Sequence, residues 1–358
     1  MRRSRDPIFA PARKKHPFFI ALIVVILFII VTVVAFNYIN NIRVTLLKQS
    51  ITIPSLPKQA ENLRILHISD LHGISFGPDQ SRLKDTLKGA KYNIVCFTGD
   101  AVAQNGDYTA FLELIDLFPS TPFYFVAGDE DPAPIIATPH EGDSPKAEWI
   151  RAAEEMGAIY LDAPVKISGG TNNVWLSPER VYSLDAKGTE AALKDRREEL
   201  MKEEDSPAKK AALEAVAYQE DQLSRIRQAR KEMLSGDTHL ALSHHPLTKS
   251  AMENLVEFLR EDNESYVSSI ALILAGHYVG GQWRLPLVGA LKAPASSGLG
   301  NNGWFPEDHF VSGLSYTLGI AQYVSPGLGT SSAMGLLPIR LFNTPAITQI
   351  TLTTKITH

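Results

Sequence analysis

Short apolar runs alternate with amphipathic segments along much of the chain. Helical periodicity is found at 79–90, 108–118, 146–156 and 249–261. Apolar runs typical of buried strands lie between these segments, at 63–68, 92–97, 122–126, 240–242 and 270–274. Shorter strands are expected at 158–161, 164–167, 173–176, 320–324 and 346–352. Alternation of strand and helix requires crossover connections, so the pattern predicts an α/β protein with a largely parallel sheet at its start.

The N-terminal part has a different pattern. Residues 18–36 carry no charge and are almost all apolar, and about 20 such residues span the hydrocarbon core of a bilayer. Six basic residues precede the run, opposed only by Asp6. The positive-inside bias therefore predicts a cytoplasmic tail at 1–16 and a transmembrane helix at 17–38, with the rest of this single-pass membrane protein outside the cytoplasm. A cleaved signal peptide is the competing interpretation, but 34–38 offers no small-x-small cleavage site.

The remainder divides into a linker, a domain and an insertion. Residues 39–60, with Pro54 and Pro57, are expected to be a linker, and 61–358 to be one large domain. Residues 185–237 are rich in Ala, Glu, Lys and Arg and carry a narrow apolar stripe of helical spacing. This predicts an inserted α-helical hairpin. Its simplest role is stability, and the alternative is an arm that binds a protein partner.

Composition excludes some classes of function. The net charge is -4, which gives no reason to expect nucleic-acid binding. Cys96 is the single cysteine, so no intramolecular disulfide is possible. It lies inside an apolar strand pattern, where a buried structural thiol is expected.

Six short stretches carry residue types that bind metals, and four of them directly follow strand-type runs. They are Asp70-Leu71-His72, Gly99-Asp100, Gly128-Asp129-Glu130-Asp131, His244-His245-Pro246, Gly276-His277 and Gly280-Gly281-Gln282. The carboxyl ends of strands are where α/β sheets build their sites. Mixed imidazole and carboxylate ligands suit Mn²⁺, Fe, Zn²⁺ or Ni²⁺. The set is large enough for one or two divalent ions, and a pair about 3.5–4 Å apart is a common device for phosphoester hydrolysis.

These stretches resemble the calcineurin-like metallophosphoesterases from about Leu63 to Leu352. The family pattern is Asp-x-His, Gly-Asp, Gly-Asn-His-Asp/Glu, a histidine shortly before a proline, and Gly-His-x-His. The resemblance implies a four-layer αββα sandwich. The end of the chain resembles the bacterial membrane-attached or exported phosphodiesterase branch. The stretches that carry this second resemblance are Gly280-Gly281-Gln282, Arg284-Leu285-Pro286, Tyr323 to Thr330 and Pro338 to Phe342.

The resemblance also implies roles for single residues. Asp70 and His72 would hold a first ion, and Asp100 would bridge the two ions. Asp129, His244 and His277 would hold the second ion. In the implied mechanism a metal-bound hydroxide attacks phosphorus, with Asp100, His244 and Glu130 as the catalytic residues.

Three positions depart from the family pattern. Asp129 replaces an asparagine, Glu130 replaces a histidine thought to stabilise or protonate the phosphate, and Val279 replaces the last histidine. Valine cannot ligate a metal, so the first ion is expected to have one protein ligand fewer and to bind more weakly than the second. His245 is interpreted as a surface or supporting side chain.

Two functions are compatible with these patterns. The first is a membrane-anchored, metal-dependent phosphoesterase, expected to be a phosphodiesterase acting on lipid-linked or envelope-derived phosphoesters. The second is a protein that keeps the fold, has lost the chemistry and acts as a binding or scaffold module through 185–237. The retention of Asp70, His72, Asp100, His244 and His277 favours the enzyme, because a dead site has no physical need for them.

Overall fold

The computed structural model describes residues 17–136, 144–261, 270–296, 299, 301–334 and 339–355. The expected tail at 1–16 lies outside these residues. The chain divides into two compact units, Met1–Ile39 and Asn40–His358. The first unit contains most of helix α1 (Pro17–Asn41). Among the described residues, α1 is the one helix long and apolar enough to cross a membrane, a test that a signal sequence near the N-terminus also passes.

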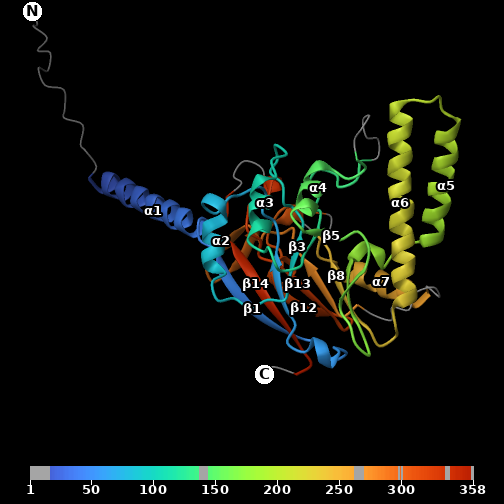
Figure 1. The fold of residues 1–358 in the computed structure, drawn as a ribbon. Coiled ribbons are helices and arrows are strands. Elements are labelled where there is room, and N and C mark those ends of the chain that lie inside the picture. Colours follow the sequence, from blue (N-terminus) through green and yellow to red (C-terminus); the bar gives the residue numbers. More distant parts are fainter. Residues whose placement is uncertain are drawn as a thin grey trace, which may run out of the picture. The chain divides into compact units, whose positions relative to one another are not determined.

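The second unit contains two six-stranded sheets (Figure 1). Four strands of the first sheet follow the order β2, β3, β4 and β5 and are parallel. The antiparallel strand β14 precedes β2, and β1 forms the edge. The strands of this sheet are β1 (Thr45–Thr52), β14 (Ala346–Thr353), β2 (Arg64–Ile68), β3 (Ile94–Thr98), β4 (Phe123–Val126) and β5 (Ile159–Tyr160).

The second sheet has a parallel centre with antiparallel edges. Its order is β12-β13-β9-β8-β7-β6, with β12 and β6 antiparallel to their neighbours. The strands are β12 (Gly313–Thr317), β13 (Ile320–Val324), β9 (Leu272–Ala275), β8 (Thr238–Leu242), β7 (Val174–Pro178) and β6 (Val165–Ser168).

Alternation along each strand produces the layers. In β2, Leu66 and Ile68 pack with the helices on the outer face of the first sheet, whereas Ile65 belongs to the core between the sheets. The outer helices are α2 (Ser81–Thr86), α3 (Thr109–Asp116) and α4 (Glu148–Glu155). In β8, Leu240 faces the first sheet and Ala241 packs against α7 (Lys249–Glu261). The arrangement is helix, sheet, sheet, helix, which agrees with the predicted sandwich.

The segment expected to be a linker contains a strand instead. β1 pairs in parallel with β14, from Thr45 opposite Ala346 to Thr52 opposite Thr353. Ile51 is fully buried in the core between the sheets. Most residues of β1 are polar and only one is buried, as expected for an edge strand, so its sequence resembles a linker. The segment 278–318 contains β10 (Trp283–Leu285), β11 (Gly289–Lys292), α8 (Asp308–Val311) and β12.

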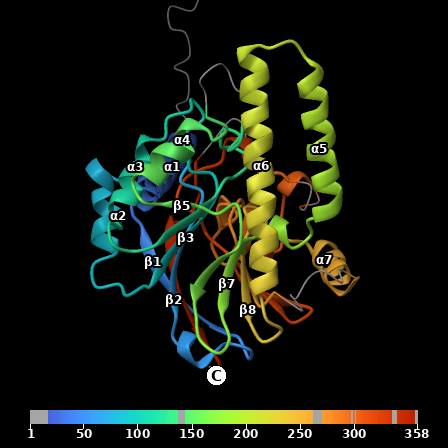
Figure 2. The same ribbon diagram turned by 45° about the vertical axis from the view of Figure 1, so that its right-hand side comes forward.

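The insertion at 185–237 is a pair of helices, α5 (Ala186–Lys202) and α6 (Pro207–Glu232). Figures 1 and 2 show them side by side and antiparallel, projecting beyond the sheets. Asp185 caps α5 and Ser206 caps α6 through backbone amides of the first turn. Leucines and small residues of both helices form a separate apolar cluster. The base of α6 is fixed by Asp162, which accepts hydrogen bonds from Arg225.

Candidate metal centre

Five strand ends supply the candidate ligands. Asp70 and His72 follow β2, Asp100 follows β3, and Asp129 follows β4 in the first sheet. His244 follows β8 and His277 follows β9 in the second. Hydrogen bonds join the two groups of loops: the His277 amide donates to Asp70 Oδ1 (2.8 Å), and His244 Nδ1 donates to the Thr98 carbonyl (2.9 Å). The two sheets therefore deliver their loops to one place.

The backbone is strained at the predicted ligands. Asp70, His72, Asp100 and His277 have φ of 54°, 48°, 56° and 74°, a left-handed conformation that costs a non-glycine residue about 1–3 kcal/mol. Hydrogen bonds hold two of these turns in place, from the Asp70 amide to Gly99 O (2.9 Å) and from the His72 amide to Asp100 O (2.8 Å). The surrounding structure thus imposes the conformation that aims these side chains.

Two glycines allow the loops to approach each other closely. Gly99 has a φ of 84°, and a Cβ there would lie 2.8 Å from Gly128 Cα and would also meet the ring of His244. A Cβ on Gly128 would collide with the backbone and carboxylate of Asp100. The glycine before each aspartate in the sequence therefore reflects close packing of the β3 and β4 loops beneath the site.

One group of donors surrounds Asp129. Its Oδ1 lies 2.7 Å from His244 Nε2 and 3.2 Å from His277 Nδ1, and those two nitrogens are 3.2 Å apart. His245 Nε2 is 3.5 Å from the same oxygen. Within the described part of the chain, these four residues form one of three groups whose ligand atoms lie within 4.8 Å of one another.

The other two groups share Asp100. One joins it to Asp70 and His244, and the other joins it to His72 and Glu130. Asp100 Oδ2 is 3.2 Å from His244 Nε2 and 3.7 Å from His72 Nε2. Asp100 thus lies between the places expected for the two metal ions, where the resemblance to the family puts the bridging carboxylate. The structure brings all six predicted metal ligands together.

The donor set fits metal ions. His72 Nε2 and Asp100 Oδ2 are buried, and neither has a hydrogen-bond partner. A buried polar atom without a partner costs about 1–3 kcal/mol, and a cation between these two atoms would remove that cost. Imidazole nitrogens and carboxylate oxygens are also the ligands that transition ions prefer.

Charges within the site compensate each other. Burial raises the pKa of Asp70, with the nearby Asp100 adding to the effect and the histidines opposing it. Burial also opposes ionisation of Asp129, but hydrogen bonds from His244 and His277 hold its pKa below the ordinary value. Burial lowers the pKa of His244, but the pairing with Asp100 outweighs it and raises that pKa well above the ordinary value. The His244 ring, paired with the carboxylates of Asp100 and Asp129, thus supplies positive charge at the place where a metal ion would lie.

Glu130 is clamped by a different loop. Its carboxylate accepts hydrogen bonds from the hydroxyls of Ser331 and Ser332 and from the Ser332 amide (3.2 Å), at the start of η5 (Ser332–Met334). Its Oε2 is 3.6 Å from His72 Nδ1. These bonds keep the Glu130 carboxylate beside His72, where the first metal ion is expected. In all of them the carboxylate oxygens are the acceptors.

Asp131 was not predicted as a site residue. It accepts hydrogen bonds from the backbone amides of Asp100 (2.9 Å), Val102 (2.8 Å) and Gly128 (2.8 Å). Burial and the charge of Asp100 raise its pKa to about 6. Asp131 therefore fastens the loops after β3 and β4 together. The signal available in the sequence was its place in the acidic stretch after Gly128.

His245 lies beside the candidate ligands, whereas Val279 supplies none. His245, interpreted from sequence as a surface or supporting side chain, is half exposed and its ring centroid lies 4.0 Å from that of His277. Burial, together with the charges of His277 and His244, lowers its pKa to about 4. Val279 is fully buried and supplies no ligand atom.

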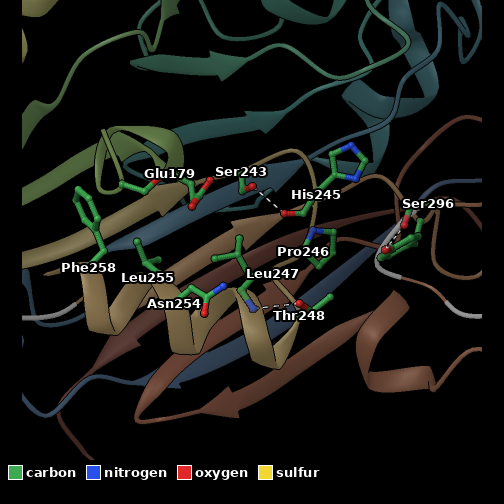
Figure 3. A pocket seen from close by; sticks show the side chains of 13 residues that line it. Glu179, Ser243, His245, Pro246, Leu247, Thr248, Asn254, Leu255, Phe258 and Ser296 are labelled. Atoms are coloured by element: carbon green, nitrogen blue, oxygen red, sulfur yellow. Dashed lines mark hydrogen bonds between the residues drawn. The ribbon is translucent and has the colours of Figure 1, made fainter. Parts of the chain in front are cut away.

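A cavity of about 640 Å³ opens beside His245 (Figure 3). Leu247, Leu255 and Phe258 form apolar parts of its wall, and Glu179 and Ser243 lie across from α7. Tyr278 and Ser296, joined by a hydrogen bond of 2.6 Å, also line it. The cavity provides room for an organic group next to the candidate metal ligands.

The model of the calcineurin-like phosphoesterase family matches residues 63–280. The chain belongs to this family. The match spans all five strand ends that carry the candidate ligands, so the calcineurin-like phosphoesterase domain supports a metal-dependent phosphoester hydrolase. A search of curated proteins finds no match.

Proposed function

We propose that this calcineurin-like protein is a metal-dependent phosphodiesterase, anchored by α1 and acting outside the cytoplasm. The observation that carries the phosphoesterase chemistry is the convergence of six donors from five strand ends around buried, unpartnered atoms of His72 and Asp100. Asp70 and His72 would hold a first divalent ion, and Asp129, His244 and His277 a second, with Asp100 between them. When bound, such ions supply Lewis acidity to water and to phosphate oxygens.

The chain's own groups orient this site. The Thr98 carbonyl can only accept a hydrogen bond, so His244 Nδ1 carries a proton. The lone pair of Nε2 is therefore the one that can ligate a metal ion. The Glu130 amide donates to Asp100 Oδ1 (2.9 Å), which leaves Oδ2 for the positions on either side. The backbone thus fixes which His244 nitrogen keeps its proton when Nε2 binds a metal, and it orients the Asp100 carboxylate.

Two features favour a diester over a monoester. Asp129 and Glu130 add negative charge where the family pattern has neutral or basic side chains, which disfavours a dianionic monoester more than a monoanionic diester. The described lining of the cavity beside His245 contains no lysine or arginine. It offers apolar side chains of α7 and polar groups opposite, which suits the organic group of a lipid-linked or envelope-derived phosphodiester.

The test uses the full chain purified in detergent and stripped of metal. Mn²⁺ or Zn²⁺ is added back, and hydrolysis of bis(p-nitrophenyl) phosphate is compared with that of p-nitrophenyl phosphate. We expect metal-dependent turnover with preference for the diester, and a loss of at least about 100-fold in His244→Ala, because a metal ligand is removed. His309→Ala, at an exposed histidine of α8, is the matched control. Full activity in His244→Ala would overturn the proposed site.

The scaffold function remains the second candidate, favoured by Val279 and by the clamped Glu130. Under that hypothesis the chain binds metal but hydrolyses neither ester. Restoring both family histidines in Val279→His with Glu130→His would then generate activity that the natural chain lacks.

A further inference from the structure

Four donors from three loops surround a single position. Asp129 Oδ1 lies 2.7 Å from His244 Nε2, 3.2 Å from His277 Nδ1 and 3.5 Å from His245 Nε2. With metal–ligand bonds of about 2.0–2.2 Å, two ligands of one ion stand roughly 3 to 3.5 Å apart. The spacing therefore fits one shared ion with small adjustments of these side chains.

The place of His245 in the fold supports its membership in this set. Ser243 Oγ donates to the His245 carbonyl (2.7 Å), which holds the turn that directs both neighbouring histidines to the site. The His245 ring stands against the ring of His277 and at 5.0 Å from that of His244. Its carboxylate neighbour is the same Asp129 that contacts the other two imidazoles.

The two positions differ in ligand chemistry. The position at Asp129 is surrounded by three imidazoles and one carboxylate. The position at Asp100 and His72 has carboxylates from Asp70, Asp100 and Glu130 nearby. Imidazole suits Zn²⁺ and similar ions, whereas carboxylate oxygen suits Mn²⁺ and Mg²⁺. The site thus contains one nitrogen-rich and one oxygen-rich position.

We propose that His245 is a metal ligand, and that with Asp129, His244 and His277 it forms a three-imidazole site that selects Zn²⁺ over harder ions. This inference rests on the metal centre of the proposed function and extends it to a fourth side chain. His245 lines the cavity beside the site, and its side chain is half exposed, so this ligand lies next to an arriving organic group.

The experiment measures metal binding directly. Full chain in detergent is stripped of metal and titrated with Zn²⁺ against a chromogenic chelator, for the wild type, His245→Ala, His245→Gln and the control His309→Ala. We expect Zn²⁺ affinity at the tighter position to fall at least about 10-fold in both His245 variants and to stay within about twofold in the control. The visible spectrum of the Co²⁺-loaded chain should change in the same two variants. Unchanged affinity and an unchanged spectrum would overturn the inference.

Turnover of the diester, measured on the same samples, separates this inference from the proposed function. Weakened Zn²⁺ binding in the His245 variants, with no turnover by the wild type, supports the inference and overturns the proposed function. Turnover with unaltered Zn²⁺ binding does the reverse. The side chain of His245 is 46% exposed, so the metal-free variants should unfold at the wild-type temperature, which circular dichroism checks.

Discussion

Replacing Arg340 by methionine should destabilise the domain strongly. Arg340 is 1% exposed and is the largest fully buried side chain of the described residues. Its guanidinium donates to the carbonyls of Asn343 (3.0 Å), Gly329 (3.0 Å) and Pro326 (2.9 Å). The loop it holds supports the metal centre, because the Gly329 amide donates to the Asp70 carbonyl (2.5 Å). Burial lowers the pKa of Arg340 to about 9, so it remains charged at pH 7.

The magnitude follows from these three bonds. A hydrogen bond with a charged partner contributes about 1.5–3 kcal/mol net, and the methionine variant leaves three buried carbonyls without a donor. Removing the cost of burying the guanidinium offsets part of the loss. Each buried acceptor left without a donor costs about 1–3 kcal/mol, out of a total stability of roughly 5–15 kcal/mol. Allowing for that offset, we expect Arg340→Met to lose about 3–5 kcal/mol and to bind metal more weakly at Asp70.

Urea unfolding followed by tryptophan fluorescence measures the loss in metal-free, detergent-solubilised protein. Arg196→Met is the control, because Arg196 is on the surface of α5 and forms an exposed ion pair with Glu199 at 3.4 Å. Exposed pairs of this kind contribute about 0–1 kcal/mol. If Arg340→Met unfolds within about 1 kcal/mol of the wild type, the bonds to the backbone do not stabilise the loop as argued.

Three further changes probe other parts of the molecule. Gly128→Ala should lower Zn²⁺ affinity at least about 10-fold, since its Cβ collides with Asp100; elemental analysis would show undiminished metal if this is wrong. Burial lowers the pKa of His239 to about 4, against about 6.5 when unfolded. Stability should therefore fall as pH drops from about 6.5 to 4, by up to about 3 kcal/mol, and urea midpoints should show a shallower fall in His239→Gln. Asp162→Asn weakens the bidentate contact with Arg225, so limited proteolysis should cut α6 faster while diester turnover stays unchanged; equal cleavage rates would contradict that anchor.

The sequence predicted the parts of the site that depend on local pattern. A buried apolar run followed by a polar turn marks a strand end, and this sufficed to bring together Asp70, Asp100, Asp129, His244 and His277. The layer order followed from the same runs together with the family resemblance. These predictions succeed because each relies on neighbouring residues and on the general geometry of parallel sheets.

The remaining features depend on contacts between distant segments. β1 resembles a linker because its burial comes from pairing with β14, about 300 positions later. The clamp on Glu130 comes from Ser331 and Ser332, and periodicity does not indicate such a contact. His245 follows His244 directly, and sequence alone does not tell whether two adjacent side chains turn to the same side.

The position of β14 has a consequence for how the chain folds. The last strand lies between β1 and β2 and pairs with both. The first sheet therefore cannot be completed during synthesis until residues 346–353 have been made. Until then β1 has no partner strand in that sheet. Non-local pairing of this kind slows folding and exposes strand edges while it is incomplete. A truncation before Ala346 would remove an interior strand of the sheet and leave β1 unpaired, although it deletes only the end of the sequence.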